Sequence, residues 1–361
     1  MKITTLDLID FRNYPKAHIT FGDGVNILVG KNAQGKTNVL EAIHFLATSR
    51  SFRTRHFKEA IRFDQPFAVI EGRADGFRST DLRIVLSQEG KKTFVNGASA
   101  DNAGDFIGYL NAVLFVPEDL MMVKGSPKLR RRLLDDELSK MSPIYLYSIT
   151  KYRQLVKERN ACLKVLKDKK QDGDLVLDVL SEQLADTQVN LIRKRAVFTK
   201  RLSQAAGTIY KDISAGEELT IAYKCSYKKA DKGVILEKYR KTVSRDIAYA
   251  QTVDGLHKDD LVFRLDGQDA GQFASQGQQR SIVLAVKMAI LDIIQEDTGD
   301  YPVLLLDDVL SELDAARQTK LLAHIEHKVQ TMMTTTSITG IDHPAITNAT
   351  IITVDQGRTE Q

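Results

Sequence analysis

The sequence is poor in cysteine and proline. Among 361 residues there are two cysteines, Cys162 and Cys225, with neither the spacing of a metal site nor the pattern of a disulfide framework. We interpret both as reduced thiols. The seven prolines form no linker, and the chain has no internal repeat and no low-complexity tract. These absences exclude a disulfide-rich secreted fold and a repeat architecture.

Long apolar runs are also missing. No window approaches 18 uninterrupted apolar residues, and Asp7 and Asp10 fall where a signal peptide needs its apolar core. We therefore expect a cytoplasmic protein that has no membrane partner. The net charge of +4 is small, and by itself it neither indicates nor excludes nucleic-acid binding. A hydrophobic content of 43% indicates a folded chain with one large or two medium domains.

The stretch "GKNAQGKT" at residues 30–37 matches the phosphate-binding loop pattern. An apolar run, "VNILV", precedes it and a segment with helical periodicity follows, which is the required order of strand, loop and helix. Gly30 and Gly35 let the backbone wrap phosphates, Lys36 reaches the β and γ oxygens, and Thr37 can ligate Mg²⁺. The other predicted ATP-binding residues of this stretch are Lys31, Asn32, Ala33, Gln34 and Asn38.

A second motif, "YPVLLLDD", has the pattern of a Walker B strand. We expect this strand to lie beside the strand of the phosphate loop, with Asp307 supporting the metal ion and Asp308 acting on the attacking water. The alternative is a core strand that ends in a solvated acidic turn, which the phosphate loop makes the weaker interpretation.

Before this strand, "FASQGQQRSIVLAVKMAILDII" predicts a long helix that begins near Ser275. A serine at a helix N-terminus can cap the helix or help to bind an anion. Its place ahead of a Walker B strand resembles the signature motif of ABC ATPases, which contacts the γ-phosphate held by the other subunit. In the same class "VLSELDAARQ" resembles the D-loop, and "MMTTTS" resembles the switch strand, with Thr335 and Thr336 where the class often has histidine.

About 240 residues separate the phosphate loop from Ser275, which is too many for a transporter motor. Two charge-rich, periodic segments within this insertion predict two long antiparallel helices with a break at "KDKKQDGDL". The predicted fold class is α/β, an ABC-type ATPase head with a phosphate-loop sheet, flanking helices and an antiparallel β part. Residues 1–118 and 215–361 would form this head, and residues 119–214 a short helical arm.

Taken together, the motifs resemble the RecF family of bacterial recombination mediators. The resemblance covers nearly the whole chain and includes "LIDFRNY", "GKNAQGKTNVLEAI", "SRSFRT", "FVPEDLMMVKGSPKLRRRLLD", "ASQGQQR" and "LLLDDVLSELD". One stretch departs from the family pattern: in "GLHKDDL", Leu256 and Lys258 stand in place of proline and arginine.

The resemblance implies roles for further residues. Ser275, Gly277 and Gln278 would face the partner's γ-phosphate, and Arg12 would approach the phosphates unless it is an ordinary surface arginine. Glu118 is a weak candidate for the Q-loop position. Many ABC ATPases have glutamate at the position of Asp308; because aspartate is one methylene shorter, we expect slow ATP hydrolysis suited to a switch.

Two basic clusters are candidates for DNA contact. The first, "SRSFRTRHFK", contains Arg50, Arg53 and Arg55. The second, "KGSPKLRRR", contains Lys128, Arg130 and Arg131, but in this cluster Arg131 can also pair with Asp135, and Arg132 with Asp136, as i,i+4 pairs on a helix. The sequence shows no helix-turn-helix and no zinc finger, so any DNA binding should be directed by shape and backbone.

The sequence therefore predicts an ATP- and Mg²⁺-dependent homodimer that closes over double- or single-stranded DNA, especially at gapped junctions. The resemblance implies action at single-strand gaps and stalled forks, with RecO and RecR, in recombinase loading, DNA replication and the SOS response. A phosphotransferase, a transporter motor subunit and a nucleotide-gated scaffold without significant hydrolysis remain alternatives.

Overall fold

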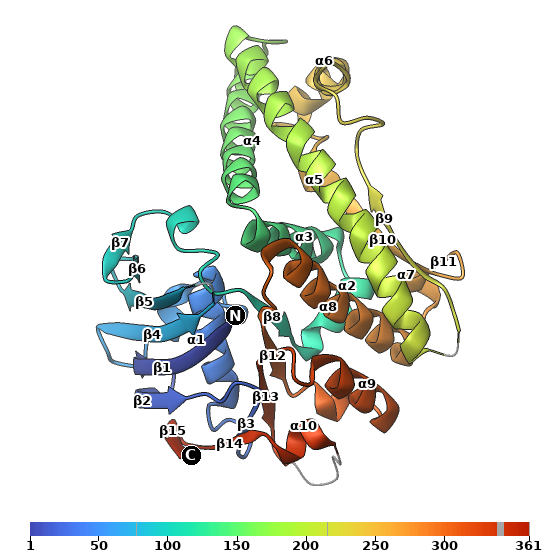
Figure 1. Ribbon diagram of the computed structural model, residues 1–361. Coiled ribbons are helices and arrows are strands. Elements are labelled where there is room, and N and C mark those ends of the chain that lie inside the picture. Colours follow the sequence, from blue (N-terminus) through green and yellow to red (C-terminus); the bar gives the residue numbers. More distant parts are fainter. Residues whose placement is uncertain (77, 215, 338–342, 361) are drawn as a thin grey trace. The chain divides into compact units, whose positions relative to one another are not determined.

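The computed structural model describes residues 1–76, 78–214, 216–337 and 343–360, which form two compact units (Figure 1). The first unit comprises Met1–Leu120, Asp212–Ala215 and Arg280–Gln361. The second comprises Met121–Lys211 and Gly216–Gln279. It extends beyond the predicted arm of residues 119–214, because the segment after the arm packs with the arm helices. No helix in these ranges is long and apolar enough to cross a membrane.

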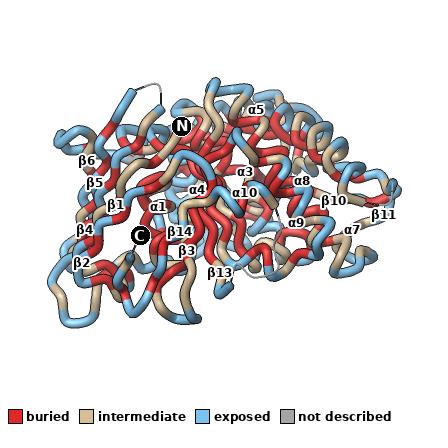
Figure 2. Tube along the Cα trace, turned by 60° about the horizontal axis from the view of Figure 1, so that its bottom comes forward, coloured by how far each residue is buried: buried red, intermediate tan, exposed pale blue. Residues whose placement is uncertain are grey.

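An antiparallel sheet forms one layer of the first unit, with strand order β2-β1-β4-β5-β6-β7. Buried and exposed residues alternate along its strands, as expected for a sheet with one face on a core (Figure 2). The strands are β1 (Lys2–Phe11), β2 (Tyr14–Thr20), β4 (Phe67–Asp75), β5 (Ser79–Ser87), β6 (Lys91–Val95) and β7 (Ala98–Ala100).

The second sheet of the first unit has the order β15-β14-β3-β13-β12-β8 and is parallel except for β15. Its strands are β3 (Val25–Val29), β8 (Ala112–Phe115), β12 (Val303–Asp307), β13 (Thr331–Thr335), β14 (Thr350–Asp355) and β15 (Arg358–Glu360). The predicted neighbourhood of the Walker B strand is wrong: β13 lies between β3 and β12. Both strands still end at the same edge of the sheet, because parallel strands align their carboxyl ends.

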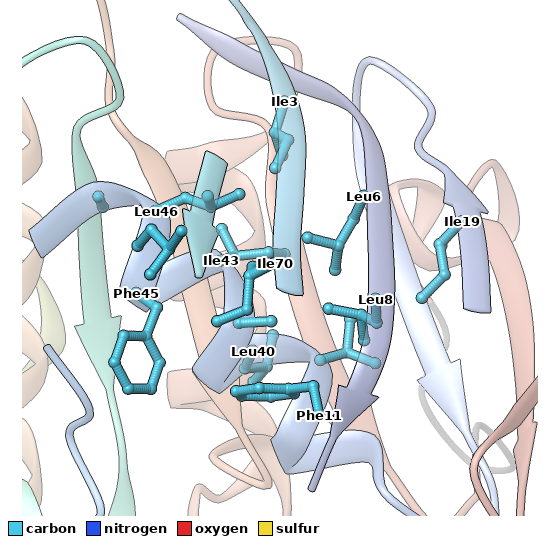
Figure 3. Packing of buried hydrophobic residues seen from close by; sticks show 14 of the residues in the cluster. Ile3, Leu6, Leu8, Phe11, Ile19, Leu40, Ile43, Phe45, Leu46 and Ile70 are labelled. Carbon is cyan, nitrogen blue, oxygen red and sulfur yellow. The ribbon is translucent and has the colours of Figure 1, made fainter. Parts of the chain in front are cut away.

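Helix α1 (Lys36–Thr48) packs between the two sheets, against β4 and β5 on one side and β12 and β13 on the other. Figure 3 shows Leu40, Ile43 and Leu46 of α1 among apolar side chains of β1 and β4. This shared core holds the start of α1 firmly in place. The remaining helical elements of this unit are α9 (Ala315–Ile325), α10 (Pro344–Thr347), the greater part of α8 (Gln276–Thr298), and the short 3₁₀ turns η1 (Phe57–Ala60), η2 (Ala103–Asp105), η3 (Pro117–Leu120) and η5 (Leu310–Glu312).

The second unit is built on long helices. Its elements are α2 (Met121–Lys124), α3 (Pro127–Met141), α4 (Pro143–Lys169), α5 (Leu175–Ile213), β9 (Leu219–Lys224), α6 (Lys232–Tyr249), η4 (Leu256–Lys258), β10 (Asp260–Leu265), β11 (Gln268–Asp269) and α7 (Ala270–Phe273). Helices α4 and α5 run antiparallel, as predicted, with the turn where the sequence has its break (Figure 1). The first predicted helix is in fact two, α3 and α4. Pro143 begins α4, and Ser142 is extended with φ −142° because the α conformation is disfavoured before proline.

Buried arginines tie these elements together. Arg159 of α4 is 1% exposed and donates to Asp246 of α6 at 2.8 Å and to Ser181 of α5 at 3.0 Å. Arg195 of α5 donates to Asp135 of α3 at 2.7 Å. Removing one partner of such a pair leaves a buried charge and costs about 3–5 kcal/mol. The second unit therefore depends on these pairs for its arrangement.

The divergent stretch "GLHKDDL" forms η4 and joins this network. His257 contacts the Tyr152 hydroxyl at 2.8 Å, Asp260 accepts two hydrogen bonds from Arg130, and the carbonyl of Asp259 accepts one from Arg131. Burial lowers the pKa of His257. In this chain the stretch has a structural role within the second unit.

Candidate nucleotide-binding site

The loop between β3 and α1 depends on two glycines. Gly35 has φ +118°, and a Cβ atom there would lie 2.7 Å from Asn13 Oδ1. A Cβ atom at Gly30 would lie 2.2 Å from the carbonyl oxygen of Val354. Any side chain at either position would force the loop to move. Packing against these neighbours therefore requires glycine at both positions.

Neighbouring side chains hold this loop in shape. Asn13 donates to the carbonyl of Gln34 at 2.8 Å and accepts from Asn38 at 2.7 Å, and the Tyr14 hydroxyl donates to the carbonyl of Gly35 at 3.1 Å. Sequence reasoning missed Asn13 and Tyr14; the only available signal was their place beside Arg12 in "FRNY". The remaining predicted residues of the loop, Lys31, Asn32 and Ala33, are exposed at its tip.

Lys36 folds back across the loop. Its ammonium donates to the carbonyls of Gly30 at 2.6 Å and Lys31 at 2.8 Å. Burial lowers the pKa of Lys36, and the nearby carboxylates of Asp308 and Asp307 oppose this change. The ammonium is thus held at the mouth of the loop, where phosphate oxygens can replace the carbonyls as acceptors.

The side chain of Thr37 contacts the last residue of β12. Its hydroxyl donates to Asp307 Oδ1 at 2.8 Å, and the hydroxyl of Thr334 donates to the same oxygen at 2.8 Å. Burial raises the pKa of Asp307, and these two hydrogen bonds oppose the rise. A hydroxyl and a carboxylate oxygen suit Mg²⁺, which is bound with few protein ligands plus phosphates and water. Within the described ranges no cluster of three acidic, histidine or cysteine residues could hold a metal by itself.

Asp308 has a strained backbone that directs it into the pocket. Its φ is +53°, a conformation that costs free energy for a residue other than glycine. Its backbone N–H donates to Thr334 Oγ1 at 2.9 Å, and its side chain is exposed to the pocket. Thr334, which sequence reasoning missed, thus contacts both acidic residues. Of the predicted switch positions, neither Thr335 nor Thr336 lines the pocket.

The pocket around these groups has a volume of about 1080 Å³ and lies wholly within the first unit. Lys36, Thr37, Asp307, Asp308 and Glu118 are among the residues that line it. The segment from Ile61 to Gln65, in which Phe63 is 85% exposed, also lines the pocket. No motif in the sequence pointed to this segment. Its role in the pocket comes entirely from the folding of the chain.

Arg12 lies in the pocket and is already paired. It has φ +55°, donates to both carboxylate oxygens of Glu41 at 2.9 and 2.6 Å, and donates to the carbonyl of Glu59 at 2.7 Å. Glu41 is fully buried and also accepts from Ser51 at 2.5 Å. The arginine is therefore fixed by α1 and has donors left for a phosphate.

The predicted signature residues belong to the second unit. Ser275 precedes the first residue of α8, and its Oγ accepts from Gln278 N–H at 3.2 Å. In return Gln278 Oε1 accepts from Ser275 N–H at 2.6 Å. This reciprocal pair is a capping box, and it leaves the start of α8 exposed, including part of Gly277. Both interpretations of the motif, helix cap and anion site, are compatible with this geometry.

Comparisons with known proteins agree on one family. A family model described as "RecF/RecN/SMC N terminal domain" matches residues 2–359. The chain is 44% identical over 366 residues to the DNA replication and repair protein RecF of Shouchella clausii (strain KSM-K16), covering 99% of this chain and 98% of that protein. It is 43% identical over 365 residues to the protein of the same name from Listeria monocytogenes serotype 4b (strain CLIP80459), covering 99% of each. The chain belongs to the RecF family.

Solved structures agree with this assignment. The fold matches a structure described as the recombination mediator protein RecF-ATPrS in the RecFOR pathway, with a TM-score of 0.92, 30% identity, and coverage of 99% of this chain and 97% of that one. An SMC head bound to the C-terminal winged-helix domain of ScpA gives a TM-score of 0.57 at 17% identity, with coverage of 100% of this chain and 97% of that one, and shows the fold alone. The predicted family and the predicted ABC-type head are confirmed.

The two basic clusters of this RecF-family chain differ in what their arginines do. Arg53 donates to Asn38 at 2.5 Å and lines the pocket beside the phosphate loop. Arg50 and Arg55 are exposed. In the second cluster, Arg130 is 9% exposed and bound to Asp260, and Arg131 is held by Asp259.

The predicted DNA-binding residues differ in how they are paired. Arg130 donates from all three of its guanidinium nitrogens, to Asp260 and to the carbonyl of Gly125, whereas Arg131 donates from one nitrogen to the carbonyl of Asp259. The expected i,i+4 pair of Arg132 and Asp136 forms at 3.2 Å, but Asp135 pairs with Arg195 instead. Of the predicted residues, Lys128, Arg50, Arg53 and Arg55 are exposed, and they stay predictions for DNA contact.

Proposed function

We propose that this chain is an ATP-driven DNA clamp that acts as a recombination mediator at single-strand gaps and stalled forks. It binds ATP with Mg²⁺, dimerises head to tail around two nucleotides, and releases DNA after hydrolysis. The observation that carries this proposal is the 2.8 Å hydrogen bond between Thr37 and Asp307, which joins the phosphate loop and the Walker B strand in one pocket. The similar structures described as RecF-ATP and RecF-ATPrS support it.

Each residue of the pocket has a defined task. Lys36 donates to the β and γ phosphate oxygens, and Thr37 and Asp307 would hold Mg²⁺. The ion, when bound, neutralises charge on those oxygens. Asp308 accepts a hydrogen bond from the attacking water and orients it. Its side chain is shorter than glutamate, and we propose slow hydrolysis that serves as a switch.

DNA is the proposed partner outside the pocket, in double-stranded or single-stranded form at gapped junctions. RecR, together with RecO, is the proposed protein partner, since the related structures are described as part of the RecFOR pathway. In this role the clamp supports recombinase loading, DNA replication and the SOS response. A phosphotransferase would need only the first unit's pocket and would be insensitive to changes at Ser275.

Sedimentation velocity tests the central claim. The wild-type protein should be monomeric alone and with ADP, and should dimerise with ATP and Mg²⁺. A protein that stays monomeric at saturating ATP would contradict the clamp and favour a self-contained phosphotransferase. A dimer that forms with ATP but hydrolyses none would support a nucleotide-gated scaffold instead.

Asp308→Asn should separate binding from hydrolysis. Asparagine keeps the size and can still contact water, but it cannot accept a proton, so we expect hydrolysis to fall about 100-fold. The affinity for ATP should change less than about threefold, because Asp307 and Thr37 are untouched. Single-turnover hydrolysis and equilibrium ATP binding measure the two effects. Unchanged hydrolysis would remove Asp308 from the catalytic role.

Arg50→Glu combined with Arg55→Glu should weaken DNA binding without regard to sequence. Both side chains are exposed, and phosphate contacts carry no sequence information. We expect affinity for unrelated duplexes to fall alike, and the slope of log affinity against log salt to shrink by about two. Fluorescence anisotropy at several salt concentrations measures this. Lys320→Glu combined with Lys328→Glu makes the same charge change at exposed positions near α9. Equal affinities for wild type and the arginine variant would exclude this patch.

A further inference from the structure

Glu217 lies in the turn between the end of α5 and β9. Gly216 before it has φ +106°, a conformation that favours glycine, and the chain then reverses direction. Strand β9 returns along α5, where Ile221 N–H donates to Ser203 Oγ at 2.9 Å. The turn therefore places a carboxylate between the end of α5 and another part of the second unit.

Two hydrogen bonds define what this carboxylate does. Oε2 accepts from the hydroxyl of Tyr210, a fully buried residue of α5, at 2.9 Å. Oε1 accepts from Gln278 Nε2 at 2.5 Å. A carboxylate can only accept hydrogen bonds, so the amide of Gln278 must turn its NH₂ group toward Glu217.

This constraint determines whether hydrogen-bond donors or acceptors are presented at the start of α8. Gln278 Oε1 accepts from Ser275 N–H, and Gln278 Nε2 donates to Glu217, so both ends of the amide are assigned. A free amide can turn its oxygen or its nitrogen outward. Here the second N–H of Gln278 and the hydroxyl hydrogen of Ser275 have no acceptor within the described ranges, and both are donors. An anion is the ligand that such a pair suits.

We propose that Glu217 is a positioning residue for the composite ATP site. It orients Gln278 so that α8 presents donors to the γ-phosphate held by a second copy of the chain. Through Tyr210, Glu217 also links the orientation of Gln278 to α5. A movement of the helical arm can therefore change the affinity of the dimer. This inference rests on the proposed ATP-driven clamp and assigns one of its regulating contacts.

Glu217→Gln is the variant that tests it. Glutamine has the same shape but can donate to Gln278 Oε1, which allows the flipped amide. We expect the dissociation constant of the dimer, measured by sedimentation with ATP and Mg²⁺, to rise about tenfold. ATP binding by the monomer should stay within about twofold, because Glu217 lies outside the pocket. Glu218→Gln makes the same change at the next, exposed residue and should leave the dimer unaffected.

Two further variants separate positioning from a general structural effect. In a Gln278→Ala background, Glu217→Gln should have no additional effect, since it acts through that amide. Tyr210→Phe should raise the dissociation constant about threefold in the same direction. An effect of Glu217→Gln that persists without Gln278 would overturn the proposal, and so would tighter dimerisation, which would mean that Glu217 only repels phosphate.

The results distinguish a failure of the proposed clamp from a failure of the role proposed for Glu217. If wild type does not dimerise with ATP, the clamp fails, and the assignment of Glu217 fails with it. If wild type dimerises, Ser275→Arg does not, and Glu217→Gln behaves as wild type, then the clamp stands and only the role of Glu217 is wrong.

Discussion

Lys36→Met should lower the affinity for ATP on the order of 1000-fold. The ammonium provides charge-assisted hydrogen bonds to phosphate, each contributing about 1.5–3 kcal/mol, so the loss of two is about 4 kcal/mol. Methionine matches the length of the apolar stem, which is buried in the loop, so the first unit should remain folded. Equilibrium binding of a fluorescent ATP analogue measures the loss, and a thermal melt checks the fold.

The control for this variant is Lys16→Met on the exposed face of β2, which removes the same charge at a residue that does not line the pocket. It should bind ATP as wild type does. If Lys36→Met bound ATP with unchanged affinity and an unchanged melt, the loop would not be the phosphate site. The proposed function would then lose its main support.

Ser275→Arg should abolish ATP-dependent dimerisation, with a rise in the dissociation constant on the order of 1000-fold. The change removes the oxygen that accepts from Gln278 N–H and places a large side chain at an exposed helix start. A partner's nucleotide could then not approach the N-terminus of α8. ATP binding by the monomer should be unaffected, since Ser275 does not line the pocket.

Ser244→Arg provides the matched control, because Ser244 is an exposed serine of α6 in the same unit. Its dimerisation should equal that of wild type. Sedimentation velocity with ATP and Mg²⁺ reads out both variants. A Ser275→Arg protein that still forms the ATP-dependent dimer would show that the signature residues are only a helix cap, and that the dimer uses another surface.

The local features of the nucleotide site could be read from the sequence. The phosphate loop, its flanking strand and helix, and the acidic pair of "LLLDD" depend on residues close together in the chain, where spacing decides geometry. The long antiparallel helices follow from periodicity in the same way. A local pattern is sufficient to predict these features, because backbone conformation and amphipathic burial are determined by residues that lie close together in the sequence.

Only the tertiary structure decided which distant residues complete the site. The position of β13 between β3 and β12 makes Thr334 the residue that contacts both acidic groups. The same folding puts Arg53 in the pocket and binds Arg130 to Asp260. These outcomes depend on strand order and on which charges find a buried partner, and both are set by contacts between segments hundreds of residues apart or in different elements. Sequence spacing carries no record of such contacts, so charge alone could not show which arginines of the basic clusters are paired inside the fold.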